Sequence, residues 1–84
     1  MKHATSEALD RLEPFLKQLR LVPTLREKSR GVFYRGSRAF LHFHEDGETL
    51  WADIRLKDEF ERHPVTTASA RAALLKVVKA SSSR

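Results

Sequence analysis

Hydrophobic and polar residues alternate with a period of two through much of residues 32–56, which is the pattern of half-buried β-strands. Two turn signals, Gly36-Ser37 and Asp46-Gly47, divide this stretch into three runs that are rich in aromatic and β-branched residues. Glycine readily takes the positive φ that two-residue hairpin loops require. The stretch therefore predicts a three-stranded antiparallel meander.

The two turns also predict a register, and the register sorts the side chains onto two faces. In this register Phe33 lies opposite Phe40, Phe43 lies opposite Leu50, and Asp53 lies diagonal to His42. The first face is apolar and contains Val32, Tyr34, Ala39, Leu41, Phe43, Leu50, Ala52 and Ile54. The second face is mixed and contains Phe33, Arg35, Arg38, Phe40, His42, His44, Thr49, Trp51, Asp53 and Arg55.

Helical periodicity flanks the meander on both sides. A first helix is predicted from an N-cap at Ser6 to a stop at Pro23, with a kink or brief break at Pro14. A second helix is predicted over residues 68–79, with one of the two threonines before it as N-cap. Both helices have one apolar stripe, so the expected fold is an α+β, α-β-β-β-α two-layer sandwich with both helices on the apolar face.

The remaining segments are charged or terminal. For residues 25–30 a solvated loop is favoured over a short strand. Residues 57–63 are charged apart from Phe60, which is expected to plug the edge of the core. Residues 1–5 and 81–84 are expected to be flexible ends of a single small domain that covers residues 1–84.

Composition excludes several classes of function. The chain has 84 residues, a formal net charge of +5 and no cysteine, so disulfide and thiolate chemistry are excluded. No apolar run approaches the roughly 20 residues that span a bilayer, and no secretory h-region is visible, so a cytoplasmic protein without a membrane partner is expected. The positive charge favours attraction to polyanions.

The central segment reads GVFYRGSRAFLHFHEDGETLWADIRL and is followed by FERHPVTT. Over residues 31–67 it resembles a set of small uncharacterised bacterial proteins that share a GVFY-(R/K)-x-SRAFLHFHED core, an ADxR strand and a FxRxxVTT lead into the last helix. The order of elements is also similar to the YjbR/MmcQ-like proteins, whose fold has been linked to DNA-binding architectures. The resemblance implies an α+β fold and no particular activity.

The mixed face is the candidate binding surface. Its aromatic rings can stack on bases, and its arginines can contact phosphates or lie over rings. The candidate ligand-binding residues are Phe33, Arg35, Arg38, Phe40, His42, His44, Trp51, Asp53 and Arg55. The first hypothesis is therefore a small module that binds nucleic acid or another anionic ligand through this face.

The same face supports two other hypotheses. An open patch with large aromatic residues is typical of protein interfaces, so a homodimer or a partner-protein contact is the main alternative. A metal site at His42 and His44 with Asp53 is the third hypothesis, because two imidazoles and a carboxylate can hold zinc or iron. The spacing fixes no third histidine, and no metal or other cofactor is included in the main prediction.

An enzymatic function is the least supported. His42 could act as a general base oriented by Asp53, since histidine titrates near neutral pH. The sequence offers no nucleophile, glycine-rich phosphate loop or paired carboxylate to join it, so no catalytic residue is predicted.

Overall fold

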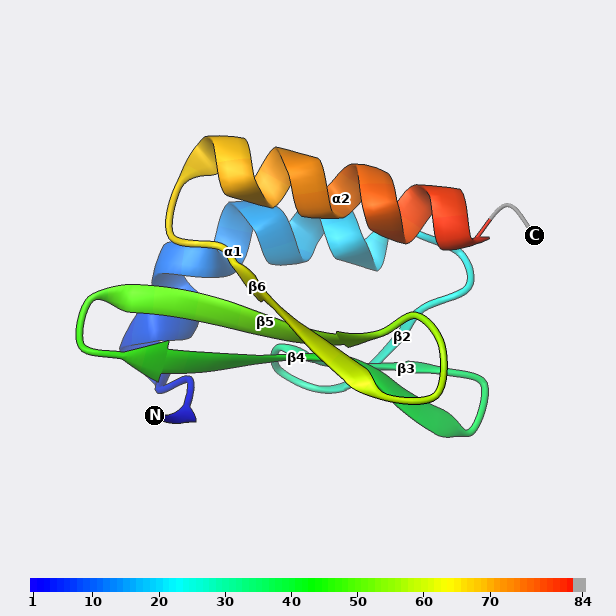
Figure 1. Cartoon of the computed structure of the whole chain (residues 1–84), viewed down its shortest axis with the longest axis horizontal. Helices are drawn as coiled ribbons and strands as arrows, with labels where there is room; N and C mark the ends of the chain where they lie inside the picture. The colour runs from blue at the N-terminus through cyan, green and yellow to red at the C-terminus, as the bar shows by residue number, and fades with distance from the viewer. Residues whose placement is uncertain (83–84) are drawn as a thin grey trace.

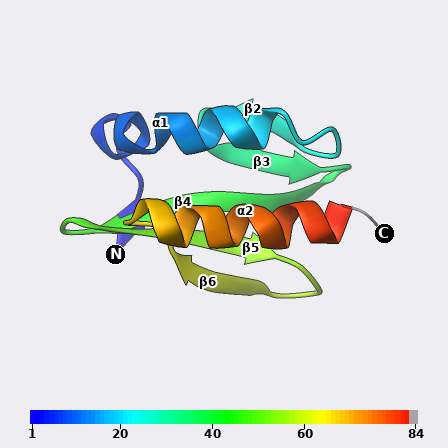
Figure 2. The ribbon, with the colours of Figure 1, turned by 90° about the horizontal axis from the view of Figure 1, so that it is seen from above.

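The computed structural model describes residues 1–82 and has two layers. Helices α1 (Ser6–Arg20) and α2 (Ala68–Ser82) lie side by side over one face of an antiparallel sheet, as Figure 1 and Figure 2 show. The α+β class and the placement of both helices on one side are as predicted. The sheet, however, has six strands in the described residues where three were predicted.

The strands are β1 (Lys2–His3), β2 (Arg26–Ser29), β3 (Val32–Arg35), β4 (Arg38–Asp46), β5 (Thr49–Arg55) and β6 (Phe60–Pro64). Five of them follow the order β2-β3-β4-β5-β6, and all pairs are antiparallel. Strand β1 pairs with the end of β4, where His3 lies opposite His44. Since β5 pairs with the same part of β4, β1 occupies the opposite edge of β4, the edge that β3 uses further along.

The preference for a loop at residues 25–30 is wrong, because Arg26–Ser29 forms the edge strand β2. Strand β6 at the opposite edge was not anticipated either. Strands β2 and β6 join the sheet through backbone hydrogen bonds, and their side chains are mostly charged, as is common on edge strands. The side-chain pattern therefore did not identify them as strands. Glu27 also ties β2 to its surroundings, since its carboxylate accepts hydrogen bonds from the Arg20 side chain and, at 2.8 Å, from the Gly31 backbone.

The chain ends contain secondary structure that the sequence analysis did not predict. Lys2–His3 forms β1, and Ala4 N donates to Phe43 O at 3.1 Å. At the other end, α2 extends to Ser82, beyond the predicted stop at residue 79. The rest of the predicted flexible tail, residues 83–84, lies outside the described residues.

A bulge in β4 inverts the predicted faces of β3. The register holds at the turn, where Arg35 pairs with Arg38, but Phe33 then pairs with Leu41 instead of Phe40. One extra residue in β4 reverses the alternation of side chains relative to β3. Phe33 and Phe40 are only 1% and 3% exposed and belong to the core, so their predicted place on the open face is wrong.

Val32 and Tyr34, predicted to be in the core, are half-buried as a result of the same inversion. Arg35, which alternates with Tyr34, turns toward the helices, where its Nη1 donates to Ser81 Oγ of α2 at 3.1 Å. Its guanidinium also lies over the ring of Phe40, 3.8 Å from the centroid. Arg38 pairs with Arg35 and so shares its face, and the bulge thus removes two aromatic side chains and two arginines from the predicted binding surface.

The second hairpin keeps its faces but changes its partners. Asp46 pairs with Thr49, so the loop is Gly47-Glu48, one residue later than predicted. Cross-strand partners consequently shift by two residues, and an even shift leaves every side chain on its predicted face. His42 is now directly opposite Asp53 and no longer diagonal to it.

The helices differ from prediction at their boundaries, and α1 has no break at Pro14, which was one of the two predicted outcomes there. Thr5 is the N-cap of α1 instead of Ser6, and its hydroxyl accepts from Ala8 N at 3.3 Å. The helix runs continuously through Pro14. Of the two threonines predicted as N-cap candidates, Thr67 caps α2, and its hydroxyl accepts from Ala70 N at 3.1 Å. Within residues 1–82, no helix is both long and apolar enough to cross a membrane.

The core lies between the helices and the sheet. Its largest fully buried side chains are Phe15, Phe33, Leu12, Leu16, Leu19, Leu41, Leu50, Ile54, Val65 and Val78. They come from both helices, from strands β3 to β5 and from the loop before α2, so the core depends on the sheet register.

We expect Phe33→Ala to lower the free energy of unfolding by about 3–5 kcal/mol, because it empties a fully packed site. Tyr34→Ala, the adjacent residue on the open face, should cost less than about 2 kcal/mol. Urea denaturation of both variants measures the difference. Equal costs would contradict the bulged register.

Candidate metal centre

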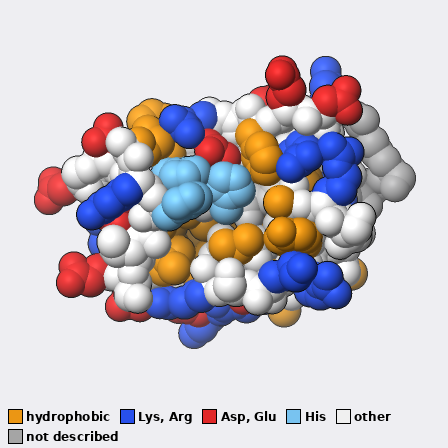
Figure 3. All heavy atoms as spheres, turned by 90° about the horizontal axis from the view of Figure 1, so that it is seen from below, with side chains coloured by type: hydrophobic (Ala, Val, Ile, Leu, Met, Phe, Trp, Pro, Cys, Tyr) orange, Lys and Arg blue, Asp and Glu red, His pale blue; other side chains and the backbone are white. Residues whose placement is uncertain are grey.

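Three histidines from two strands converge on the open face of the sheet. His42 and His44 are two residues apart in β4 and therefore share a face, and β1 brings His3 opposite His44. One ring nitrogen of each histidine lies within 4.8 Å of the others. The ring centroids of His3 and His44 are 4.6 Å apart, and those of His42 and His44 are 5.1 Å apart. Figure 3, which views this face, shows a compact histidine patch.

A buried carboxylate lies against this cluster. Asp53 of β5 is 7% exposed and lies opposite His42, and its Oδ2 is 3.2 Å from His44 Nδ1. Arg62 of β6 pairs with Asp53 in the register and donates to both of its oxygens, at 2.8 and 3.1 Å. This bidentate contact fixes the carboxylate beside the histidines.

The Nδ1 atoms of His42 and His44 are buried, and neither has a hydrogen-bond partner among residues 1–82. His44 Nδ1 lies 3.2 Å from Asp53 Oδ2, but the contact is not aligned as a hydrogen bond and would be an ion pair only with a protonated His44. A buried polar atom without a partner typically costs about 1–3 kcal/mol. Such atoms usually indicate a role for a water, an ion or a ligand.

Electrostatics keep the two β4 histidines neutral. Burial lowers the pKa of His42 and of His44 below the usual 6.5, and the attraction of Asp53 only partly opposes this. The neighbouring cationic groups, including Arg62, lower both pKa values further. The pKa of Asp53 is itself lowered, chiefly by its hydrogen bonds from Arg62. At neutral pH the site therefore combines neutral imidazoles with an ionised carboxylate, which are the protonation states that metals require.

Aromatic side chains flank the cluster. The ring centroid of Phe60 lies 4.8 Å from that of His42, and the guanidinium of Arg55 lies over the Phe60 ring, 4.5 Å from the ring centroid. Phe60 is 38% exposed, so its predicted role as a plug of the core edge is wrong. Trp51 is half-buried and pairs with both His44 and Pro64.

Five of the nine predicted surface residues remain together on the open face: His42, His44, Trp51, Asp53 and Arg55. Phe33 and Phe40 lie in the core, and Arg35 points to α2. Arg38 is exposed beside Arg35 at the hairpin turn. The predicted array of three aromatic residues and three arginines is consequently not assembled.

Sequence reasoning missed three residues of this region: His3, Phe60 and Arg62. His3 carried no signal because β1 is only two residues long and its partner is distant in the chain. The alternation of Phe60, Arg62 and Pro64 could have placed them on one face, had residues 60–64 been recognised as a strand.

No protein-family model, curated protein or solved structure matches this chain. The resemblance to small bacterial proteins over residues 31–67 therefore stays a prediction.

We expect stability to rise with pH through the histidine range. The folded pKa values of His42 and His44 lie below 6.5, so below about pH 6.5 the unfolded chain binds more protons than the folded chain. The free energy of unfolding should therefore fall between about pH 7.5 and pH 5, and the double variant His42→Gln/His44→Gln should lose that part of the slope.

Urea denaturation at several pH values tests this expectation in metal-free buffer. His63→Gln is the matched control, because His63 lies on the helix side of the sheet, opposite Ala52 and beside Leu74. If the unfolding free energy of the double variant depended on pH as strongly as that of the parent protein, His42 and His44 would not be the source of the pH dependence.

Proposed function

We propose that the protein is a metal-binding module that holds a divalent transition metal, in the first place Zn²⁺, on His3, His42 and His44. The observation that supports this most directly is the convergence of three histidine nitrogens within 4.8 Å, from strands at distant parts of the chain. Two of these histidines also have buried Nδ1 atoms without hydrogen-bond partners in the described chain.

The donor set suits zinc. Imidazole nitrogens bind Zn²⁺ at about 2.0–2.1 Å, so two ligands of a tetrahedral ion lie roughly 3.3 Å apart. Rotation of the imidazoles, most easily that of the exposed His3, brings the three nitrogens from within 4.8 Å to this spacing. Imidazole ligands also suit Cu²⁺ and Ni²⁺, which bind more strongly than earlier metals of the series.

Asp53 and Arg62 would act as outer partners of the metal. Metal-bound histidines commonly donate their other ring nitrogen to a carboxylate, which fixes the ring and raises its basicity. A small rotation of the His44 ring would align its Nδ1 with Asp53 Oδ2, now 3.2 Å away. Arg62 holds the carboxylate in place for this contact.

The proposed metal site changes which groups would bind an anionic ligand on the open face. Three imidazole ligands carry no negative charge, so they would leave the charge of the metal uncompensated and one tetrahedral position open for water or an anion. An anionic ligand of this face would then be held by the metal, with Arg62 nearby, and not by Arg35 and Arg38. Stacking of bases on Phe33 and Phe40 is disfavoured, since both rings lie in the core.

We expect tag-free protein to bind one Zn²⁺ per chain in isothermal titration calorimetry. His3→Ala, His42→Ala and His44→Ala should each weaken binding by at least about 100-fold, whereas His63→Ala should not change it. Zinc at about 100 times its Kd should stabilise the parent fold by about 2.7 kcal/mol. A parent protein without stoichiometric binding, or a His63 variant as weak as the others, would refute the proposal.

Asp53→Asn should weaken zinc binding by about 10–100-fold, because the amide keeps the shape of the side chain but loses its charge. Glu45→Gln is a suitable control, since Glu45 neighbours His44 in β4 but accepts from Thr5 N, at 2.7 Å. Competition with a zinc-sensitive dye measures both affinities. Equal effects of the two substitutions would mean that Asp53 does not support the metal ligands.

A further inference from the structure

Helix α2 has an unusual solvent-facing surface. It contains no aspartate or glutamate, and its only charged side chains in residues 68–82 are Arg71, Lys76 and Lys79. Exposed positions of the helix are occupied largely by small or apolar residues: Ala68, Ala72, Ala73, Val77 and Ala80. A surface helix normally presents polar residues to solvent, and a helix that is apolar on several sides is normally covered. The composition of α2 thus indicates a contact surface.

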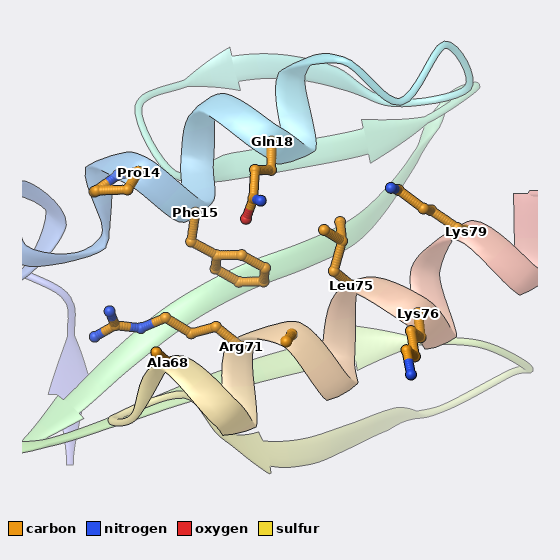
Figure 4. A pocket seen from close by; sticks show the side chains of 9 residues that line it. Pro14, Phe15, Gln18, Ala68, Arg71, Leu75, Lys76 and Lys79 are labelled. Atoms are coloured by element: carbon orange, nitrogen blue, oxygen red, sulfur yellow. The ribbon is translucent and has the colours of Figure 1, made fainter.

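A groove of about 470 Å³ lies between α1 and α2 and is lined by residues of these two helices. Figure 4 shows Phe15 of α1 and Leu75 of α2 extending into the space between the helices. Pro14, Gln18, Ala68 and Ala72 complete most of its lining. The charged side chains that line the groove, Arg71, Lys76 and Lys79, are all cationic.

The length of the groove suits a short helix. Its lining on α2 extends from Ala68 to Lys79, which corresponds to about 16 Å at a rise of 1.5 Å per residue, or three helical turns. Small residues such as Ala68 and Ala72 allow a neighbouring helix backbone to approach closely. An apolar floor with charged edges is the usual receptor for the apolar stripe of an amphipathic helix.

We propose that this groove docks an amphipathic helix of a partner protein whose edges carry glutamate or aspartate. Charge complementarity favours such a partner, because the exposed Lys76 and Lys79 line the groove and no carboxylate does, while the third cation, Arg71, is held by the backbone oxygens of Val65 and Thr66. A second copy of this chain would bring the same cationic helix against the groove, and like charges would oppose that contact. The groove is lined by the two helices, whereas the histidine cluster lies on strands β1 and β4, so this proposal does not depend on metal binding.

The first experiment uses two synthetic stapled helices as probes of the labelled protein in two-dimensional NMR titrations. The two peptides have the same length and the same leucine stripe, and differ only in having glutamate or lysine along both edges. We expect the glutamate peptide to bind at least about 10-fold more tightly at low salt, and this advantage to shrink as salt rises. Shifts should concentrate at Phe15, Gln18, Ala72 and Leu75.

Variants test whether the groove itself is responsible. Ala72→Glu and Lys76→Glu should each weaken binding of the glutamate peptide by about 10-fold or more. Both substitutions should also reduce the difference in affinity between the glutamate peptide and the lysine peptide. Lys17→Glu is the matched control, because Lys17 is exposed on α1 but does not line the groove. Melting temperatures of the three variants show that each is folded.

Several outcomes would overturn the proposal. These are equal affinity for the two peptides, no shifts at millimolar peptide, or equal effects of Lys17→Glu and Lys76→Glu. Self-association that perturbs the NMR signals of the groove residues would show that the groove binds a second copy of this chain. Binding to phosphatidylcholine vesicles with one quarter phosphatidylglycerol, without binding of either peptide, would assign it to a membrane surface.

Discussion

The pairing of β4 is the constraint on which the rest of the structure depends. This strand pairs with β5 along one edge and with β3 and β1 along the other, so it fixes the position of most of the sheet. Its alternation directs Leu41 and Phe43 toward the helices and His42 and His44 toward the open face. A slip of one residue would bury the histidines and expose the core, so the core and the candidate metal centre are specified by the same register.

The cost of burying the Asp53 carboxylate is offset by its contact with Arg62. A buried carboxylate is costly unless it is paired, and Arg62 provides two charge-assisted hydrogen bonds. The same carboxylate is adjacent to imidazoles that burial keeps neutral. Protons and a metal would compete for those nitrogens, which links the chemistry of the site to the stability of the fold.

The two layers present different chemistry to their surroundings. The open sheet face combines three histidines with one arginine-bound carboxylate, and the helix layer presents a cationic groove with an apolar floor. The histidine cluster lies outside the hydrophobic core, whereas the floor of the groove is made by the core residues Phe15 and Leu75. The proposed metal site and the proposed partner site lie on different layers of one domain of 84 residues, so they can be tested separately.

The sequence by itself determined both helices, the hairpins near Gly36 and Gly47, and the common face of His42, Trp51 and Asp53. These features follow from periodicity and turn chemistry, which neighbouring residues set. Only the tertiary structure decided the bulge that buries Phe33 and Phe40, the edge strands β2 and β6, and the arrival of His3 beside His44. The arrival of His3 depends on a pairing between segments far apart in the chain. The bulge and the edge strands join neighbouring segments, but they depend on backbone hydrogen bonds, which every residue type except proline can make and which side-chain patterns therefore specify only weakly.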